Sequence, residues 1–374
     1  MNKSPQESRR DGPKLSVVVP TLNEIDNIDQ IIRALDRCLD NEQWEVVFVD
    51  DDSADGTAER VREHASKDHR VRCIQRIGRR GLSTACIEGM LSSSAPYLAV
   101  IDGDLQHDES LLPEMLAILE QEDIDIVVGS RYIAGGGVGD WDESRVNISR
   151  LATRLSRMVI RQKLTDPMSG FFMIRREAFQ NVVRKLSGVG FKILLDIFAS
   201  SPELSRFREL PYKFRNREAG VSKLGNRVAW EYGMLLLDKL VGHIVPVRFV
   251  SFTMVGGLGM LIHLAVQAVF LKGLGFEFVI SQAIATLVAM TFNFALNNVL
   301  TYRDMSLTGW YWLRGWFSFS LACSVGAFAN VGIASYLFSH NTQWVLAAIS
   351  GILIGAVWNY AVTMVYTWKK PQKL

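Results

Sequence analysis

The chain has 374 residues, of which 48% are hydrophobic, and it carries a formal net charge of +2. It is long enough for two domains, and its near balance of charge gives no sign of a basic surface for nucleic acid. The charges are unevenly placed, because 34 basic and 37 acidic residues precede Pro246, while seven basic and two acidic residues follow it. This division indicates a soluble domain followed by a lipid-embedded one. Residues 1–13 are polar, and we expect them to form a flexible segment.

Four short runs rich in Val and Ile predict β-strands, and each run ends in a turn or an acidic residue. They are KLSVVVP (14–20), WEVVFVD (44–50), PYLAVID (96–102) and DIDIVVGS (123–130). Helix-like stretches accompany them at about 24–38, 55–66, 82–93 and 109–121. This alternation predicts an α/β domain with a largely parallel sheet that is covered by helices on both faces. Ligands of such sheets bind beyond the carboxyl ends of the strands.

Two stretches, residues 145–163 and about 223–243, predict basic amphipathic helices. In the first, apolar residues recur at intervals of three and four and so share one helical face; they are Ile148, Leu151, Leu155 and Met158 or Val159. Arginines recur in the same way on another face, at Arg150, Arg154, Arg157 and Arg161. We expect these arginines to face anionic headgroups at a membrane interface. The alternative is a helix packed on the core with a solvated basic side.

Four apolar segments follow Pro246, at about 247–271, 277–300, 314–338 and 343–367. Each is near the roughly 20 residues that a helix needs to cross the apolar core of a bilayer. They predict an all-α domain of four transmembrane helices over residues 246–374, preceded by an interfacial helix or linker at 226–245. Basic residues flank the first segment, the middle loop and the C-terminal tail. The positive-inside rule therefore predicts a cytoplasmic location for both termini and for the soluble domain.

An acidic pair follows the third strand-like run, within VIDGDLQHDES (100–110). Asp102 and Asp104 can reach one divalent cation, and the amide oxygen of Gln106 can join them. Such pairs are frequent by chance, and a capping or solvated role is the ordinary alternative, but two other strand ends here also carry acids or amides. We therefore expect Mg²⁺ or Mn²⁺ bound together with a substrate diphosphate. The chain has no P-loop and no Gly-x-Gly-x-x-Gly after its first strand, which argues against a kinase or a dehydrogenase.

Eight motifs, spread in order over residues 14–225, resemble the inverting family 2 glycosyltransferases of the GT-A fold. They are VVVPTLNE, VDDDSADGT, GLSTACIEG, DGDLQHDE, GSRY, DPMSGFFMIRR, GFKILLDI and YKFRNREAGVSKL. Within this family they look most like the dolichyl-phosphate (polyprenyl-phosphate) mannose synthases. The C-terminal part is similar to the GtrA-like membrane domain that is fused to some of them. The resemblance implies a GT-A catalytic domain over residues 14–225, with a Rossmann-like mixed sheet; Gly103 departs from the family pattern, in which Ala is more usual.

The resemblance also implies how a nucleotide-sugar donor is held. Its expected contacts are Pro20, Thr21, Asn23, Glu24, Val49, Asp51, Asp102, Gly103, Asp104, Arg217, Ser222 and Lys223. The metal ligands that it implies are Asp102, Asp104 and Gln106. Arg217, Ser222 and Lys223 are expected to close over the diphosphate, where positive charge offsets the charge of the leaving nucleoside diphosphate.

A lipid phosphate acceptor is implied on the other side of the site. Its expected contacts are Arg131, Arg145, Ser149 and Lys192, and the residues expected to be catalytic are Asp102, Asp104, Arg131 and Arg145. Arginine suits this task because its paired donors match phosphate oxygens, although a surface or ion-pair role is the alternative for each. The acceptor oxygen is already ionised near neutral pH and needs orientation only. We therefore expect no general base, and a structural role for His107.

The implied activity is transfer of mannose from GDP-mannose to dolichyl or polyprenyl phosphate, with inversion to a β-linked product. A transferase that uses UDP-glucose or UDP-N-acetylglucosamine stays open, because few contacts decide the base and the sugar. A lipid-linked-sugar flippase with a regulatory soluble domain also stays open, although the acid pair argues against it. A processive polysaccharide synthase is not expected, because the chain lacks a Gln-x-x-Arg-Trp motif. The sequence leaves the oligomeric state open.

Overall fold

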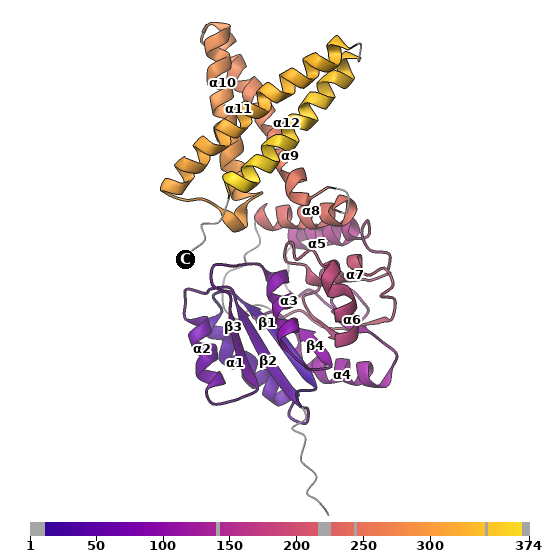
Figure 1. Cartoon of the computed structure of the whole chain (residues 1–374). Helices are drawn as coiled ribbons and strands as arrows, with labels where there is room; N and C mark the ends of the chain where they lie inside the picture. The colour runs from indigo at the N-terminus through magenta and orange to yellow at the C-terminus, as the bar shows by residue number, and fades with distance from the viewer. Residues whose placement is uncertain (1–11, 140–142, 216–225, 243–244, 341–342, 369–374) are drawn as a thin grey trace, which may run out of the picture. The chain divides into compact units, whose positions relative to one another are not determined.

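The computed structural model describes the whole chain except residues 1–11, 140–142, 216–225, 243–244, 341–342 and 369–374 (Figure 1). The chain divides into two compact units, Met1–Leu240 and Val241–Leu374. The first unit contains a seven-stranded mixed sheet with helices on both faces, which confirms the predicted α/β class. In the second unit, the described residues form helices and their connections.

The sheet of the first unit has the strand order β3-β2-β1-β4-β6-β5-β7. The strands are β1 (Leu15–Thr21), β2 (Trp44–Asp50), β3 (Val71–Gln75), β4 (Tyr97–Val100), β5 (Ile126–Ser130), β6 (Phe172–Arg175) and β7 (Phe207–Pro211). All neighbours pair in parallel except β6, which is antiparallel to both β4 and β5. The four predicted strands are therefore present. The three that sequence patterning missed are short, and polar side chains interrupt β3 and β7.

Helices cover both faces because the side chains of β1 alternate between two hydrophobic clusters. Val17 and Val19 point to the cluster beneath α1, α2 and α4, whereas Val18 points to the cluster beneath α3, α6 and α7. The helices of this unit are α1 (Ile25–Cys38), α2 (Thr57–Ala65), α3 (Leu82–Ser92), α4 (Leu112–Gln121), α5 (Glu143–Ser156), α6 (Arg176–Val182), α7 (Ile193–Ser200) and α8 (Asn226–Val241). Short 3₁₀ turns, Glu109–Leu111 and Val183–Lys185, precede α4 and follow α6.

The first amphipathic helix is shorter than predicted, because α5 ends at Ser156 and not near residue 163. After a turn, Ile160 and Leu164 enter the core, where they are 6% and 3% exposed. The second predicted amphipathic helix is α8. Tyr232 on α8 donates its hydroxyl to the Ala152 carbonyl of α5 at 2.6 Å, so the two helices are in contact.

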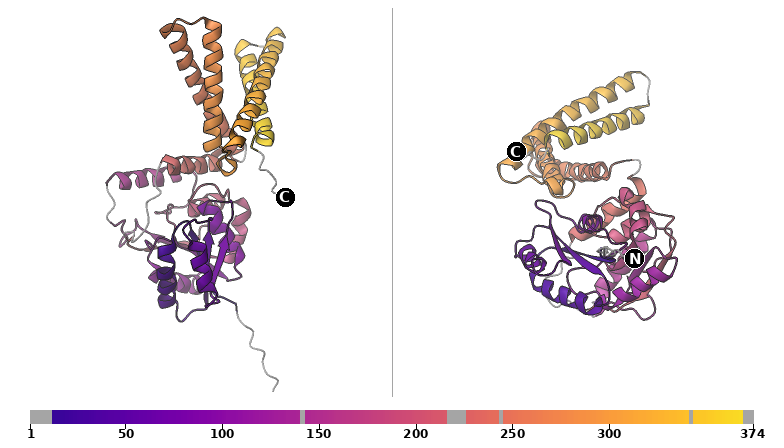
Figure 2. Two further views of the ribbon diagram at one scale, coloured as in Figure 1. Left: turned by 90° about the vertical axis from the view of Figure 1, so that its left-hand side faces the viewer. Right: turned by 60° about the horizontal axis from the view of Figure 1, so that its bottom comes forward.

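The second unit consists of two helix pairs that diverge (Figures 1 and 2). Its helices are α9 (Val247–Ala268), which continues as a π-helical turn (Val269–Gly273), α10 (Phe278–Val299), α11 (Trp310–Ser339) and α12 (Trp344–Tyr366), with a 3₁₀ turn at Arg303–Met305. α9 packs mainly on α10, and α11 packs on α12. An aromatic cluster connects the pairs, and within it Tyr302 stacks on Trp368 with a centroid distance of 3.9 Å.

Among the described residues, three helices are long and apolar enough to cross a membrane: Val247–Gly273, Phe278–Val299 and Trp310–Leu337. A shorter apolar stretch, Ser350–Tyr366, lies within α12. These four helices coincide with the four predicted segments. The prediction of an all-α membrane domain is confirmed.

Gly89 offers a test of how closely α3 packs on the sheet. A Cβ atom at this position would collide with Val18 and lie 2.9 Å from Val49 Cγ2. We expect Gly89→Ala to lower the free energy of unfolding by about 1–3 kcal/mol, because overpacking forces side chains out of their rotamers. Gly233→Ala is the control, since a Cβ in that helical position meets nothing within 4 Å. Thermal unfolding of the purified protein measures both, and an unchanged midpoint for Gly89→Ala would contradict the close packing.

Candidate active site

The carboxyl ends of β1, β2 and β4 lie side by side, as expected for parallel strands in which β1 pairs with both neighbours. Asn27 on α1 connects the loops that follow β1 and β4. Its Nδ2 donates to Glu24 Oε2 at 2.8 Å and to the Gly103 carbonyl at 3.1 Å. Predicted donor-site residues from distant parts of the chain therefore meet at one edge of the sheet.

The loop after β1 is held by the loop after β2. Thr21 Oγ1 donates to Asp50 Oδ1 at 3.2 Å, and the Asn23 N–H donates to Ser53 Oγ at 2.8 Å. Asn23 Oδ1 in turn accepts from the Ala54 N–H at 3.0 Å. The φ of Asn23 is 55°, in the left-handed region that asparagine tolerates better than most residues. Thr21 and Asn23 thus shape this edge of the sheet through hydrogen bonds within the protein.

Three other residues predicted to contact the nucleotide-sugar donor differ in their burial and in their contacts within the protein. The side chain of Val49 is fully buried within β2, whereas Pro20 is partly exposed, and contact of either with a donor stays a prediction. The Asp51 carboxylate accepts from the Gly81 N–H at 2.6 Å and pairs with Arg76 Nη1 at 3.0 Å. Burial raises the pKa of Asp51, against these two contacts. Asp51 therefore anchors the start of α3, and its predicted contact with a nucleotide stays a prediction.

The loop from Asp102 to Gln106 turns sharply after β4. Leu105 has a φ of 60°, and the Gln106 N–H donates to Asp104 Oδ1 at 3.2 Å. Gln106 Nε2 donates to the Arg215 carbonyl at 2.9 Å, which ties the loop to the segment after β7. Asp104 and Gln106 are 8% and 6% exposed, whereas the side chain of Asp102 is 32% exposed. No described residue donates a hydrogen bond to the Asp102 carboxylate, so its oxygens are available to a ligand.

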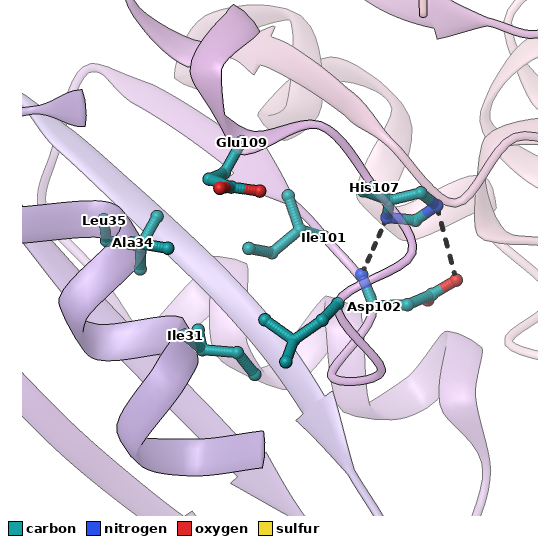
Figure 3. A pocket seen from close by; sticks show the side chains of 8 residues that line it. Ile31, Ala34, Leu35, Ile101, Asp102, His107 and Glu109 are labelled. Atoms are coloured by element: carbon teal, nitrogen blue, oxygen red, sulfur yellow. Dashed lines mark hydrogen bonds and ion pairs between the residues drawn. The ribbon is translucent and has the colours of Figure 1, made fainter. Parts of the chain in front are cut away.

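His107 supports this loop from within the protein. The Asp102 N–H donates to His107 Nδ1 at 3.1 Å, so Nδ1 is unprotonated, and Nε2 lies 3.6 Å from Asp102 Oδ2 (Figure 3). The ring stacks on Phe171 with centroids 5.3 Å apart. Burial lowers the pKa of His107, which favours the neutral ring. This geometry favours the structural role predicted for His107 over that of a base.

A cavity of about 10 Å³ lies between α1 and this loop (Figure 3). Its walls are mostly apolar and are formed by Ile31, Ala34, Leu35, Ile101, Asp102, Leu105, His107 and Glu109. Such a volume holds about one water molecule. It is therefore too small for a nucleotide sugar, and a donor has to approach Asp102 from another side.

The acid pair fits a hard divalent cation by its chemistry. Burial is the main cause that raises the pKa of Asp102, and the charge of Asp104 adds to it. A cation would offset both negative charges, and Mg²⁺ and Mn²⁺ prefer oxygen ligands of this kind. Among the described residues, no group of three or more His, Cys, Asp or Glu side chains could hold a metal. The pair would therefore share its ion with other oxygens, such as those of a diphosphate.

Arg131, a predicted acceptor contact, forms a bidentate ion pair with Asp166. Its Nε and Nη2 donate to the carboxylate at 2.7 and 2.8 Å, and its backbone N–H donates to the same carboxylate at 3.1 Å. Asp166 is fully buried, and Arg131 is 8% exposed. The ion-pair role therefore holds for two nitrogens of this guanidinium, and contact with a phosphate stays a prediction.

The loop before β6 brings the acceptor side close to the acid pair. Lys192 Nζ donates to the Met168 carbonyl at 2.9 Å, two residues before Gly170. A Cβ atom on Gly170 would lie 2.7 Å from Asp102 Oδ2, so only glycine allows this close approach. Burial lowers the pKa of Lys192 to about 8, and the neighbouring Arg131 adds to the effect. The structure thus places a titratable ammonium group beside the predicted metal ligands.

Of the remaining predicted residues, the structure describes the side chain of Ser149 only. Ser149 Oγ lies 2.7 Å from the Tyr132 hydroxyl, to which it is hydrogen-bonded. Arg145 belongs to α5, but its side chain lies outside the described residues, as do Arg217, Ser222 and Lys223 in full.

Two residues of the site were not predicted from the sequence, although both lie in recognised motifs. Asp166 opens DPMSGFFMIRR, and Tyr132 closes GSRY. Arg131 was predicted to bind a phosphate, and a later motif begins with the acidic residue Asp166. That acid is the signal that could have indicated the ion pair. Tyr132 carried no comparable signal, because its bond to Ser149 depends on how α5 packs.

The chain is similar to known proteins over both of its units. The chain matches the family models "Glycosyl transferase family 2" over residues 16–183 and "GtrA/DPMS, transmembrane domain" over residues 251–368. The dolichol-phosphate mannosyltransferase of Pyrococcus furiosus is 33% identical over 359 residues, which cover 95% of this chain and 99% of the relative. The dolichol-phosphate mannosyltransferase of Mycosarcoma maydis is 33% identical over 234 residues, or 60% of this chain and 79% of the relative. Among solved structures, glucosyl-3-phosphoglycerate synthase from Mycobacterium tuberculosis in complex with Mn²⁺, UDP and phosphoglyceric acid is 21% identical, covers 61% of this chain and 78% of that chain, and has a TM-score of 0.46.

The similarity to the Pyrococcus relative extends over nearly the whole of both chains and so includes both units. It confirms the resemblance that the motifs indicated. The chain therefore belongs to glycosyl transferase family 2, with the dolichol-phosphate mannosyltransferases, and carries a GtrA/DPMS transmembrane domain.

Proposed function

We propose that this membrane glycosyltransferase transfers mannose from GDP-mannose to dolichyl or polyprenyl phosphate, with inversion to a β-linked product. The observation that supports this most is the acid pair Asp102 and Asp104 at the shared end of three parallel strands. It occurs in a chain that is 33% identical over 95% of its length to a dolichol-phosphate mannosyltransferase. The fold and the site thus point to the same reaction.

On the donor side, Asp102 and Asp104 hold the metal in this proposal, with Gln106 as a further oxygen donor. A divalent cation, when bound, supplies positive charge next to the departing diphosphate. Arg217, Ser222 and Lys223 act on the same diphosphate. The loops after β1 and β2 hold the nucleoside, since their hydrogen bonds fix the shape of that edge before any ligand arrives.

On the acceptor side, Arg131 and Lys192 orient the lipid phosphate together with Arg145 and Ser149. Asp166 holds the Arg131 guanidinium in place through two hydrogen bonds. The phosphate oxygen attacks the sugar directly and without a general base, because it is already ionised. His107 takes no proton in this scheme, since its Nδ1 accepts the backbone N–H of Asp102.

Two other functions are separated from this one by experiment. A UDP-glucose or UDP-N-acetylglucosamine transferase would use the same acid pair and differ only in the base and the sugar. A lipid-linked-sugar flippase would need the helices and not the carboxylates. The acid pair, in a loop that is hydrogen-bonded to α1 and to the segment after β7, favours a transferase over a flippase.

The GtrA/DPMS domain and the apolar helices make this a membrane protein. We propose four membrane crossings, α9 to α12, with both termini and the catalytic unit in the cytoplasm. The support is the position of the charges, since the positive-inside rule places basic loops there. Arg248, Arg303, Arg314 and the Lys369–Lys373 tail provide them.

The donor and acceptor can be tested with the purified full-length protein. We expect radiolabel to pass into the lipid extract from GDP-mannose, and not from UDP-glucose or UDP-N-acetylglucosamine, when polyprenyl phosphate is present.

The variant Asp104→Asn tests the proposed metal site. It removes one negative charge from that site, so kcat/KM should fall roughly 100-fold or more with an unchanged thermal midpoint. Transfer from UDP-glucose alone would overturn the mannose assignment, and full activity of Asp104→Asn would overturn the metal role.

Gly170→Ala tests whether the loop before β6 must approach the acid pair. The added methyl group would displace the Asp102 carboxylate, and a shift of about 1 Å can cost up to roughly 100-fold in turnover. Gly12→Ala is the matched control, because its Cβ would meet only Ser94 Oγ, at an ordinary 3.7 Å. Steady-state assays and thermal unfolding of both variants check this. Normal turnover by a well-folded Gly170→Ala protein would contradict the placement of Asp102 in the active site.

The titration of Lys192 leads us to expect that kcat/KM for the lipid phosphate falls at alkaline pH. Because the pKa of Lys192 is lowered to about 8, its positive charge is present below that pH and is lost as the pH rises through it. We expect kcat/KM for the lipid phosphate to fall above about pH 8 in the wild type. Lys192→Arg keeps the charge, so the fall should move to higher pH, whereas Lys192→Met should be weakly active with no such limb. An identical limb in all three proteins would assign it to another group.

A further inference from the structure

A second cationic site lies beside the predicted acceptor residues, in an open pocket of about 530 Å³. This volume is within the range of small-molecule binding sites. Its walls are Tyr132, Arg150, Thr153, Arg154, Arg157 and Thr165. Arg150 and Arg154 are four residues apart and so share one side of α5, and Arg157 joins them from the turn that follows the helix.

The chemistry of the pocket selects for an anion. None of the residues that line it is acidic, and no described residue forms an ion pair with Arg150, Arg154 or Arg157. Two carboxylates that lie next to the pocket residue Thr165, in the sequence or by contact, are already engaged within the protein. Asp166 pairs with Arg131, and Glu209 accepts the backbone N–H groups of Thr165 and Asp166 at 3.0 and 3.1 Å. Three exposed guanidinium groups therefore keep their charge, and paired N–H donors of this kind match phosphate oxygens.

Tyr132 connects this pocket to the predicted acceptor site. Its side chain lines the pocket, its hydroxyl is hydrogen-bonded to Ser149 at 2.7 Å, and its ring lies 5.5 Å from the Arg131 guanidinium. Ser149 directly precedes Arg150 in α5. A ligand that orders the arginines will thus also restrain two of the residues predicted to bind the acceptor phosphate.

The neighbouring face of α5 is apolar and exposed. Ile148, Leu151 and Met158 are 68%, 58% and 62% exposed, although side chains of this kind are usually buried. A helix with one apolar and one arginine-rich face lies in the boundary between lipid headgroups and acyl chains. In that position, the arginine pocket is at the depth of lipid phosphates.

We propose that this pocket binds the phosphate headgroup of an anionic membrane phospholipid, as a subsite separate from that of the acceptor phosphate. The exposed apolar side chains beside the arginines favour such an occupant, because acyl chains can cover them while the headgroup meets the guanidinium groups. The acceptor phosphate has its own predicted contacts at Arg131, Arg145, Ser149 and Lys192. The bound phospholipid positions Tyr132 and Ser149, and so raises transfer to the lipid acceptor. Only this effect on activity rests on the proposed function.

Direct binding can be measured on the full-length protein in detergent micelles. Labelled dioleoylphosphatidylglycerol is incubated with the protein and followed through gel filtration, with labelled dioleoylphosphatidylcholine and labelled polyprenyl phosphate in parallel. The wild type should retain the phosphatidylglycerol in preference to the phosphatidylcholine. The triple variant R150Q/R154Q/R157Q should retain at least about tenfold less of it, because each arginine near an anionic lipid contributes to binding. Retention of polyprenyl phosphate should not change.

The matched control is R161Q/K163Q, which removes two exposed cations that follow α5 and do not line the pocket. It should retain phosphatidylglycerol as the wild type does. In nanodiscs, phosphatidylglycerol should stimulate transfer by the wild type and by the control, but not by the triple variant. Should the thermal midpoint of the triple variant fall, the three single Arg→Gln variants replace it, and each should show a partial loss.

Three results would overturn the proposal. The first is equal retention of phosphatidylglycerol by the triple variant and the wild type. The second is a loss of phosphatidylglycerol retention in R161Q/K163Q that equals the loss in the triple variant. The third is a triple variant that loses retention of polyprenyl phosphate alone, which would assign the pocket to the acceptor. An inactive wild type in every lipid would count against the proposed function only, since the retention experiment reads the pocket without turnover.

Discussion

Two negative charges at a largely buried strand end are the constraint around which the candidate active site is built. Burial raises the pKa of Asp102, and the negative charge of Asp104, two positions further on, adds to this effect, so the folded chain must supply compensation or leave it to a ligand. The chain itself compensates only part of this charge. Asp104 accepts a backbone N–H from Gln106, whereas no described residue donates to the carboxylate of Asp102. The Asp102 oxygens, which accept no hydrogen bond from the described residues, can therefore bind a cation that is shared with a diphosphate.

The surroundings of the pair are organised to keep it in place. His107 accepts the N–H of Asp102, the Asn27 side chain donates to Gly103, and Gly170 allows the next loop to lie against Asp102. Each of these contacts comes from a different segment of the chain. The loop that carries the carboxylates is therefore held in place by the protein itself, as the proposed catalytic role requires.

The cationic groups fall into two classes that differ in their partners. Arg131 is tied to the buried Asp166, and Lys239 of α8 is tied to the buried Asp196 at the start of α7. The arginines of α5 have no such partner among the described residues. Buried pairs hold geometry, because breaking one leaves an uncompensated charge inside the protein. The exposed arginines are the ones proposed to bind phosphates outside the protein.

The second unit follows the packing rules of membranes. Gly259 on α9 lies against Asn293 on α10, and Gly326 on α11 lies against Asn359 on α12. In each pair, the absence of a side chain lets a neighbouring helix approach closely, which is the usual basis of helix association in lipid. The polar side chains of Asn293 and Asn359 thus lie at contacts between neighbouring helices.

The sequence by itself determined the α/β class, four of the strands, the four apolar helices and the acid pair, because each of these depends on local periodicity or on a short motif. Tertiary structure alone decided the antiparallel insertion of β6, the early end of α5, and the pairing of Arg131 with Asp166, which lies 35 residues away. It also decided that Tyr132 joins the arginine pocket to Ser149. Such features depend on which distant segments compete for the same space and charge, and no local pattern in the chain carries that information.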